Sequence, residues 1–283
     1  MKEWGLAIEG GGIRGAYAAG VTDVLMENNL YASFCYGTSA GALIGANYTA
    51  HESGRTIDLM LNAMHNPKFA SPINLWKKGN VFDFDWLFHR ITNRFPFDEK
   101  TFHSSSTDFF AVSFNCLTGN PIYWNKNDPE FYAGLASSCS LPLYTTKPIF
   151  VHGTPCLDGG LCERVPFHQM LLEKRKNIVV IATRPRGFRY EKGISEKEKR
   201  AVERRYKDYP KLLEVETNNH FIYNQHMDEL EHLEDSGRLI VVWPSKPLNI
   251  SFFEFRKKKI LPLYELGRSD CLALLDKIQK SIH

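Results

Sequence analysis

The segment Tyr36-Gly37-Thr38-Ser39-Ala40-Gly41 lies between two runs of different pattern. Residues 33–36 favour a short strand, whereas residues 42–48 are small and apolar, as in a closely packed helix. A serine on such a turn, with a glycine two positions to either side, has the spacing of a nucleophile elbow. The turn strains its central residue, so the positions two away need to be almost without side chain. The pattern predicts that Ser39 presents its hydroxyl above a helix N-terminus, where negative charge is favoured.

A simpler interpretation of the same segment stays open at this point. Five positions with three fixed residues match often by chance, and a serine before a helix commonly caps it. In that case Ser39 would satisfy a backbone N–H group of the helix and carry no chemistry. The rest of the chain has to distinguish the two interpretations.

A glycine-rich loop precedes this segment. Residues 4–8 predict a buried strand and residues 16–27 a helix, with Gly10-Gly11-Gly12-Ile13-Arg14-Gly15 between them. The loop fits the G-x-G-x-x-G pattern of dinucleotide binding, but that function expects a carboxylate at the end of the second strand, where Ser39 stands. The three successive glycines fit an oxyanion hole equally well, because their bare N–H groups can approach a developing oxyanion. Arg14 would orient the loop or neutralise charge, unless it is an ordinary surface arginine.

Strand and helix patterns alternate along the chain, which favours a parallel sheet covered by helices on both faces. Residues 177–183 form the best strand, because they are β-branched and unbroken, as expected at the centre of such a sheet. Further strands are predicted at 109–115, 121–124 (as a hairpin with 109–115), 149–151, 154–157 and 238–243, and further helices at 56–65, 85–91, 130–138, 195–206, 209–235 and 261–282.

Asp158-Gly159-Gly160 follows the predicted strand at 154–157. Catalytic carboxylates of α/β sheets stand at strand ends of this kind. The same triplet also fits an Asx-turn that begins a tight turn.

Two further segments have two interpretations each. The aromatic stretch at 69–97 predicts the wall of an acyl-chain pocket or a lid that contacts lipid, or else ordinary packing, and the basic run at 256–259 favours anionic lipid or is a solvated face.

Composition limits the class of protein. Of 283 residues, 43% are hydrophobic and 13% aromatic, enough for a sizeable core, and a net charge of +3 is too small to indicate a nucleic-acid partner. The six cysteines have no metal-ligand spacing and the carboxylates form no calcium loop, so we expect no metal and no cofactor. With no secretory leader and no run of about 20 apolar residues, we expect a cytoplasmic protein with reduced thiols that associates transiently with membrane surfaces.

The three motifs, taken in this order, resemble those of the patatin-like phospholipases, and most of all their bacterial branch. Softer similarity continues to about residue 186, through Gly79…Phe82-Asp83, Ser137-Ser138…Leu141-Pro142 and Val165-Pro166. One position departs from the family. Many members carry an asparagine shortly after the Asp-Gly-Gly triplet, where this chain has Cys162-Glu163-Arg164.

The resemblance implies an α/β fold of three layers, α/β/α, with a mainly parallel central sheet. It implies a catalytic domain at 1–190 and a mostly helical extension at 191–283 packed on the same domain. It also implies a serine acyl hydrolase, a phospholipase A, lysophospholipase or lipid esterase, whose lipid or acyl-ester substrate is taken from a membrane surface. Ser39 would be the nucleophile and Asp158 the base. The other site residues implied are Gly10, Gly11, Gly12 and Arg14 of the oxyanion hole, Gly37, Thr38, Ala40 and Gly41 of the elbow, and Gly159 and Gly160.

An aspartate with an ordinary pKa of about 3.9 is a poor base for a serine hydroxyl. The Ser-Asp mechanism therefore needs Asp158 to be close to Ser39, partly desolvated and aimed at Oγ.

Two other functions stay open. A Ser-His-Asp enzyme of the α/β-hydrolase type would use a histidine after Asp158, although only two strands precede Ser39. The chain could also be a pseudo-enzyme that binds lipid without turnover. The histidines available to a triad are His168, His220, His226 and His232.

Overall fold

The computed structural model describes residues 2–90, 94–251 and 254–282. Within these residues, eight strands form one sheet in the order β5-β6-β3-β2-β1-β7-β8, and β4 pairs with β3 outside this path. The strands are β1 (Gly5–Ile8), β2 (Phe34–Thr38), β3 (Asp108–Asn115), β4 (Pro121–Asn125), β5 (Ile149–Val151), β6 (Thr154–Asp158), β7 (Ile178–Ile181) and β8 (Leu239–Val242).

The centre of the sheet is parallel, as predicted. Strands β3, β2, β1, β7 and β8 all run in one direction, whereas β4, β5 and β6 are antiparallel to their neighbours. The register brings distant residues to one level of the sheet. Thr38 of β2 pairs with Val112 of β3, and the next residue, Ser113, pairs with Asp158 of β6. The ends of β2 and β6 therefore meet although many residues separate them in the chain.

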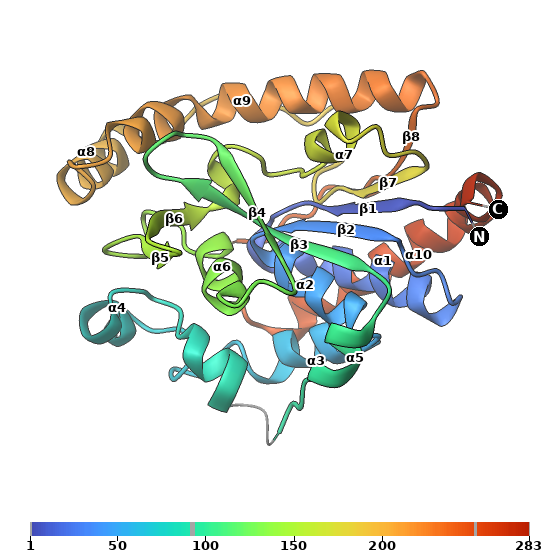
Figure 1. Ribbon diagram of the computed structural model, residues 1–283, viewed down its shortest axis with the longest axis horizontal. Helices are drawn as coiled ribbons and strands as arrows, with labels where there is room; N and C mark the ends of the chain where they lie inside the picture. Colours follow the sequence, from blue (N-terminus) through green and yellow to red (C-terminus); the bar gives the residue numbers. More distant parts are fainter. Residues whose placement is uncertain (1, 91–93, 252–253, 283) are drawn as a thin grey trace.

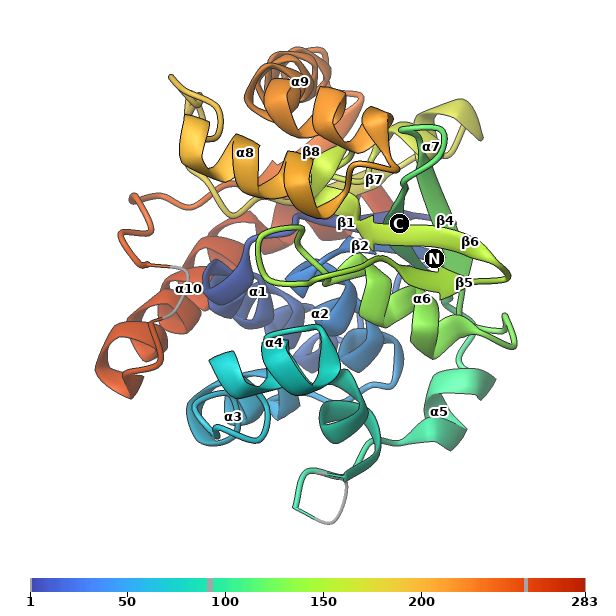
Figure 2. The same ribbon diagram turned by 90° about the vertical axis from the view of Figure 1, so that its left-hand side faces the viewer.

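Helices cover both faces of the sheet, which makes the three layers of the predicted fold (Figures 1 and 2). One face, which we call the α1 face, carries most of the helices. The other, the α9 face, carries α7, α8 and α9. The bounds on the α1 face are α1 (Gly15–Glu27), α2 (Ala40–Thr49), α3 (Arg55–Asn62), α4 (Pro72–Lys78), α5 (Glu99–Ser104), α6 (Phe131–Ser138) and α10 (Lys257–Ile282), and on the α9 face α7 (His168–Leu172), α8 (Glu196–Arg205) and α9 (Pro210–Asp235).

Alternating side chains of each strand supply the two apolar layers. In β7, Val179 and Ile181 belong to the buried cluster under α1 and α10, whereas Ile178 and Val180 belong to the cluster under α9. Successive strand residues point to opposite faces, so a strand covered on both sides needs an unbroken apolar run. This explains why residues 177–183 had the strongest strand pattern.

The second part of the chain joins the same sheet. Strand β8 extends it beyond β7, and α10 packs directly on α1. A Cβ atom on Gly267 of α10 would lie 2.0 Å from the Tyr17 carbonyl oxygen, so only glycine allows this approach. Near the two termini, which lie together in Figure 1, the Lys2 N–H donates to the Ile282 carbonyl at 2.8 Å. The division of the chain at residue 190 stays a prediction.

Short elements differ most from the prediction. Helices α4, α5 and α7 have seven, six and five residues, too few for a helical period to be detected, and the sequence did not predict them. The helix predicted at 85–91 is a π-helical turn at Trp86–Arg90, and Ile91 lies outside the described residues. Helix α10 begins at Lys257, earlier than predicted, with Pro262 inside it. In the described parts of the chain, the search for a helix of bilayer-spanning length and hydrophobicity found none.

Candidate active site

Ser39 occupies a strained turn between β2 and α2. Its backbone has φ 56° and ψ −125°, a conformation that residues with side chains rarely adopt. The two flanking glycines make the turn possible. A Cβ atom on Gly37 would lie 2.4 Å from the Gly41 carbonyl oxygen, and one on Gly41 would lie 2.3 Å from the Ile8 carbonyl oxygen. The backbone is therefore packed too closely here for any other residue.

The Ser39 hydroxyl is directed at Asp158. Oγ of Ser39 donates a hydrogen bond of 2.8 Å to Oδ2 of Asp158. The side chain of Ser39 makes no capping bond to α2, so the interpretation of this serine as a simple helix cap is wrong. The serine is half-buried. Its hydroxyl is thus held by a carboxylate on one side and still reachable from the other.

Asp158 is buried at the end of β6, with 1% of its surface exposed. Burial raises the pKa of this carboxyl to about 6, because a charge is poorly solvated there. Hydrogen bonds from the Gly160 N–H (2.8 Å, to Oδ1) and from Ser39, together with the nearby charge of Arg164, oppose the rise in this pKa. The aspartate is therefore ionised at neutral pH but is a stronger base than an exposed aspartate.

The glycine loop approaches Ser39 from the end of β1. Gly10 is so close that a Cβ atom on it would lie 2.9 Å from the Thr38 carbonyl oxygen, and its N–H donates to the Arg164 carbonyl at 2.9 Å. The N–H groups of Gly11 and Gly12 have no acceptor among the residues that the structure describes. Gly12 has φ +55° and lines the same pocket as Ser39. Two of the three predicted donors are therefore unoccupied, and Gly10 has a backbone partner.

Arg14 follows the loop but is not among the residues lining the pocket of Ser39. Burial, followed by repulsion from Arg184, lowers the pKa of the Arg14 guanidinium. Its Nε is buried, with no hydrogen-bond partner within the described part of the chain. The groups whose charges act on Arg14 are Glu9, Arg164, Arg184 and Tyr190.

The end of α6 holds the backbone of the elbow. Oγ of Ser138 accepts a hydrogen bond from the Ser39 N–H at 3.0 Å and donates to the Val112 carbonyl at 2.6 Å. The Cys139 thiol donates to the Ser39 carbonyl at 3.2 Å. Thr38, the buried residue before the serine, donates its hydroxyl to the Glu163 carbonyl at 2.9 Å. The strained turn is thus fixed by two side chains from the end of α6 and by the bond from Thr38 to the backbone of Glu163.

Asn219 of α9 is a site residue that the sequence did not reveal. Its Nδ2 donates to the carbonyls of Gly160 and Leu161, at 2.8 and 2.6 Å, directly after Asp158. Its Oδ1 accepts from the half-buried Arg164 at 2.7 Å. An asparagine amide therefore does reach the Asp-Gly-Gly turn, but from the second part of the chain. The only local signal is that Thr217, Asn218 and Asn219, all weak helix formers, stand together inside a long helix.

The histidines lie elsewhere. His168 contacts the carboxylates of Glu163 and Glu229 at 3.2 and 3.1 Å, and His226 packs against its ring. No histidine is among the described residues that line the pocket of Ser39. The hydroxyl of Ser39 thus meets a carboxylate directly, which is not the arrangement of a Ser-His-Asp triad.

The pocket above Ser39 is apolar. Beside Ser39 and the small residues Gly12, Gly15 and Ala40, its lining is Leu43, Ile44, Thr56, Met60, Met64, Phe69, Phe82, Phe84, Cys139 and Leu141. The aromatic stretch at 69–97 thus contributes to the pocket wall.

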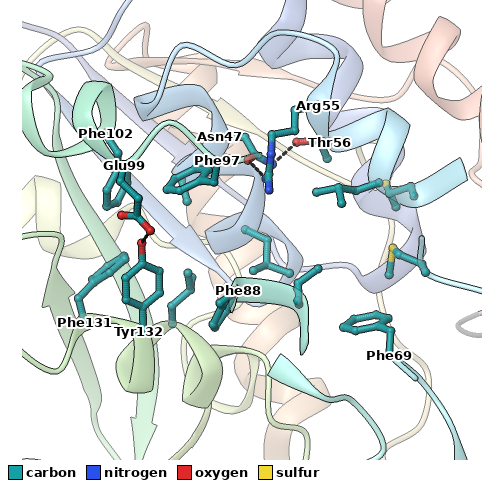
Figure 3. Close-up of a pocket in the computed structure, with 17 residues that line it drawn as sticks. Asn47, Arg55, Thr56, Phe69, Phe88, Phe97, Glu99, Phe102, Phe131 and Tyr132 are labelled. Carbon is teal, nitrogen blue, oxygen red and sulfur yellow. Dashed lines mark hydrogen bonds between the residues drawn. The ribbon is translucent and has the colours of Figure 1, made fainter. Parts of the chain in front are cut away.

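A second cavity adjoins the pocket and is shown in Figure 3. Five residues line both spaces, namely Leu43, Thr56, Met60, Met64 and Phe69. Polar groups in the wall of the second cavity are paired with each other. Arg55 donates to Asn47 Oδ1 at 2.6 Å, and the Tyr132 hydroxyl donates to Glu99. The interior that continues from Ser39 is therefore mostly hydrocarbon.

Comparisons with known proteins show the family of the chain. A family described as "Patatin-like phospholipase" matches residues 6–171, and a "Domain of unknown function (DUF6363)" matches residues 209–283. "Uncharacterized protein YjjU" of Escherichia coli (strain K12) is 24% identical over 269 residues, 93% of this chain and 74% of that protein.

Two yeast proteins and one solved structure are also similar to this chain. "Lysophospholipase NTE1" of Candida glabrata and of Saccharomyces cerevisiae are each 27% identical over 172 residues, 59% of this chain but only 10% of their own lengths. The crystal structure of VipD from Legionella pneumophila shares the fold, with a TM-score of 0.50 and 12% identity over 98% of this chain and 67% of that one. The chain belongs to the patatin-like phospholipase family and is an ester-bond hydrolase acting on lipid acyl groups.

Proposed function

We propose that this protein hydrolyses lipid acyl esters through a dyad of Ser39 and Asp158, without a cofactor. The observation that carries the proposal is the 2.8 Å hydrogen bond from Oγ of Ser39 to Oδ2 of Asp158. This bond joins a solvent-reachable serine on a strained turn to a buried carboxylate whose pKa is raised. The serine also lines an apolar pocket. Such a combination is typical of an activated nucleophile.

In the first half of the reaction, Oγ of Ser39 attacks the ester carbonyl carbon while Asp158 takes the hydroxyl proton. The carbonyl oxygen becomes an oxyanion, which the unoccupied N–H groups of Gly11 and Gly12 stabilise. When the intermediate collapses, Asp158 returns the proton to the departing alcohol oxygen, and the acyl group stays on Ser39. The hydrogen bond from Gly160 to the other carboxylate oxygen holds Asp158 in place during both transfers.

In the second half, water takes the position of the alcohol. Asp158 removes a proton from this water as its oxygen attacks the acyl carbonyl, and the proton then returns to Oγ as the fatty acid leaves. The acyl chain extends from Ser39 through the apolar pocket toward the cavity of Figure 3. The names of the yeast relatives favour lysophospholipids among the substrates, beside phospholipids and simple esters.

The protein is proposed to take these substrates from a membrane surface and to work in the cytoplasm. The six cysteines Cys35, Cys116, Cys139, Cys156, Cys162 and Cys271 are all free thiols, in keeping with a reducing compartment.

The test uses a fluorophosphonate probe and a panel of p-nitrophenyl esters, lysophospholipids and phospholipids. We expect the wild type to be labelled on Ser39, and Ser39→Ala to lose both labelling and turnover. Asp158→Asn should keep the fold but lose about a hundredfold or more in rate, the usual contribution of a general base. A wild type that binds lipid but is not labelled would instead be a lipid-binding pseudo-enzyme. Full activity in either variant would remove that residue from the mechanism.

A further inference from the structure

Helix α4 is a fixed element on the α1 face. Oγ of Ser71 accepts a hydrogen bond from the Asn74 N–H at 3.2 Å, and Pro72 opens the first turn. Gly79 ends the helix at φ +76°, in the left-handed region that favours glycine. Seven residues are few for a helix, but both ends carry their preferred capping residues. The sequence of α4 therefore defines where the helix begins and where it ends.

Asn74 decides which face of α4 points inward. Its side chain is buried, and its Nδ2 lies within 3.1 to 3.3 Å of the carbonyls of Lys68, Phe69 and Val81. These contacts join α4 to the chain on both sides of it. A rotation that buried another face would leave this amide and these carbonyls without partners, which is costly.

The opposite face of α4 carries large apolar side chains in solvent. Ile73 is 61% exposed and Trp76 is 84% exposed, and their spacing of three residues puts them side by side on the helix. Lys77 and Lys78 follow, both exposed, and Lys78 also pairs with Asp83. A nearly bare tryptophan beside an aliphatic residue and cationic groups is typical of a surface that contacts another phase.

The segments on both sides of α4 line the Ser39 pocket. Phe69 and Phe82, which flank α4 in the chain, both line that pocket. Figures 1 and 2 place α4 on the α1 face of the sheet, the face that also carries α2 and α3, and residues of these two helices line the pocket as well. Whatever binds α4 is therefore connected through these two short segments to the wall of the pocket.

We propose that α4 docks on the surface of membranes that contain anionic lipids, and that Ile73 and Trp76 enter the interface while Lys77 contacts lipid phosphates. The indole of a tryptophan suits the boundary between headgroups and hydrocarbon, and lysines complement the negative surface. A helix of seven residues is small for a stable protein interface, which takes about 800 Å² from each partner, but two inserted side chains are enough to contribute to membrane binding. Docking itself does not depend on the proposed function. The inference rests on that function only where it says that docking delivers lipid to Ser39.

The experiment is vesicle co-sedimentation of the full chain in the Ser39→Ala background, so that no lipid is consumed. Vesicles contain equal parts of phosphatidylcholine and phosphatidylglycerol, or phosphatidylcholine alone. We expect binding to the anionic vesicles that weakens about tenfold or more in Trp76→Ala, and again in Lys77→Glu. Phe221→Ala is the matched control, because Phe221 is 60% exposed on α9, on the other face of the sheet, and should bind as the parent does.

Tryptophan fluorescence supplies a second readout. Addition of anionic vesicles should shift the emission to the blue, and this shift should be absent in Trp76→Phe, which keeps the other four tryptophans. Equal binding by Trp76→Ala and the parent would overturn the proposal, as would self-association through Trp76 without vesicle binding. Vesicle binding through Trp76 in a protein that hydrolyses no ester would leave this inference standing and overturn the proposed function. Ester hydrolysis without vesicle binding would do the reverse.

Discussion

Asn219 and Gly160 are joined by a hydrogen bond of 2.8 Å from the asparagine Nδ2 to the glycine carbonyl oxygen. Gly160 in turn donates its N–H to the Asp158 carboxylate, so Gly160 links the asparagine to the aspartate. Asn219 belongs to the segment at 209–283 that matches a domain of unknown function, whereas Gly160 lies in the patatin-like match. The second segment therefore supports the turn that carries the proposed base.

Replacement of Asn219 by alanine should lower kcat more than it raises KM. The Gly160 and Leu161 carbonyls lose their donor, and Arg164 loses the acceptor that holds it near Asp158. With soluble p-nitrophenyl butyrate we expect kcat to fall about tenfold, which corresponds to about 1.4 kcal/mol of transition-state stabilisation, with KM within about twofold.

Asn218→Ala is the matched control for this change. Asn218 is the neighbouring residue on α9, and its amide donates to the Glu214 carbonyl of the same helix, at 2.9 Å. It should keep the wild-type kcat. If Asn219→Ala lowers the melting temperature but leaves kcat unchanged below it, the asparagine supports the fold and not the base.

The rate of hydrolysis should fall as the pH is lowered through about 6. Asp158 accepts a proton in the mechanism only when it is ionised, and burial raises its pKa to about 6. On the acid side, the pH at which kcat/KM for a neutral ester falls to half should therefore lie about two pH units above the value expected for an exposed aspartate. A limb near pH 4 would show that the carboxyl is solvated in the working enzyme.

Because it is buried, the ionised Asp158 should lower the free energy of unfolding of the protein. A carboxyl whose pKa is raised on folding disfavours the folded state once it ionises, so the wild type should lose stability as the pH rises from about 4 to about 6. Asp158→Asn removes this charge and should raise the free energy of unfolding at pH 7 by about 1 to 3 kcal/mol. Urea unfolding at pH 7 and at pH 4 measures it, since the gain should disappear at pH 4. A less stable variant at pH 7 would contradict this account.

The elbow and the Asp-Gly-Gly turn could be predicted because their demands are local. Gly37 and Gly41 are required by contacts within the turn itself and with β1. Glycines two residues to either side of a serine are therefore a local signal of the elbow, and the other two motifs of the chain make this signal specific. The long strands and helices were equally predictable, because their hydrophobic periods extend over many residues.

The supports of the site could not be predicted in this way. Asn219 meets Gly160 only because α9 lies across the sheet, and nothing in the helical pattern of α9 specifies that contact. The pairing of Ser113 with Asp158 depends on β6 running antiparallel to β3, which a pattern of single strands does not determine. Contacts of this kind are set by the packing of whole elements, so they become visible only in the folded chain.

Gly41→Ala should destroy the site and weaken the fold. The added methyl group would lie 2.3 Å from the Ile8 carbonyl oxygen, which belongs to a central strand and cannot move away cheaply. We expect a loss of about 3 kcal/mol or more in the free energy of unfolding and no labelling by a fluorophosphonate. Gly187→Ala is the control, because Gly187 has open space around it and only a positive φ, which costs about 1 kcal/mol. Similar losses in both variants would mean that the close approach of Gly41 is not what limits this position.

The length of the acyl chain should depend on Ala46. This residue lines the cavity of Figure 3 but not the pocket of Ser39, and it is only 6% exposed. Ala46→Phe places a ring where the end of a long chain would lie, so kcat/KM for p-nitrophenyl palmitate should fall about tenfold or more while that for the butyrate stays within about twofold. Leu135→Ala is the opposite change, since Leu135 lines the same cavity and its truncation adds room. It should favour palmitate over butyrate, although loss of a buried leucine costs about 2 to 5 kcal/mol of stability. If both variants change the two esters by the same factor, the chain does not enter this cavity and leaves Ser39 by another route.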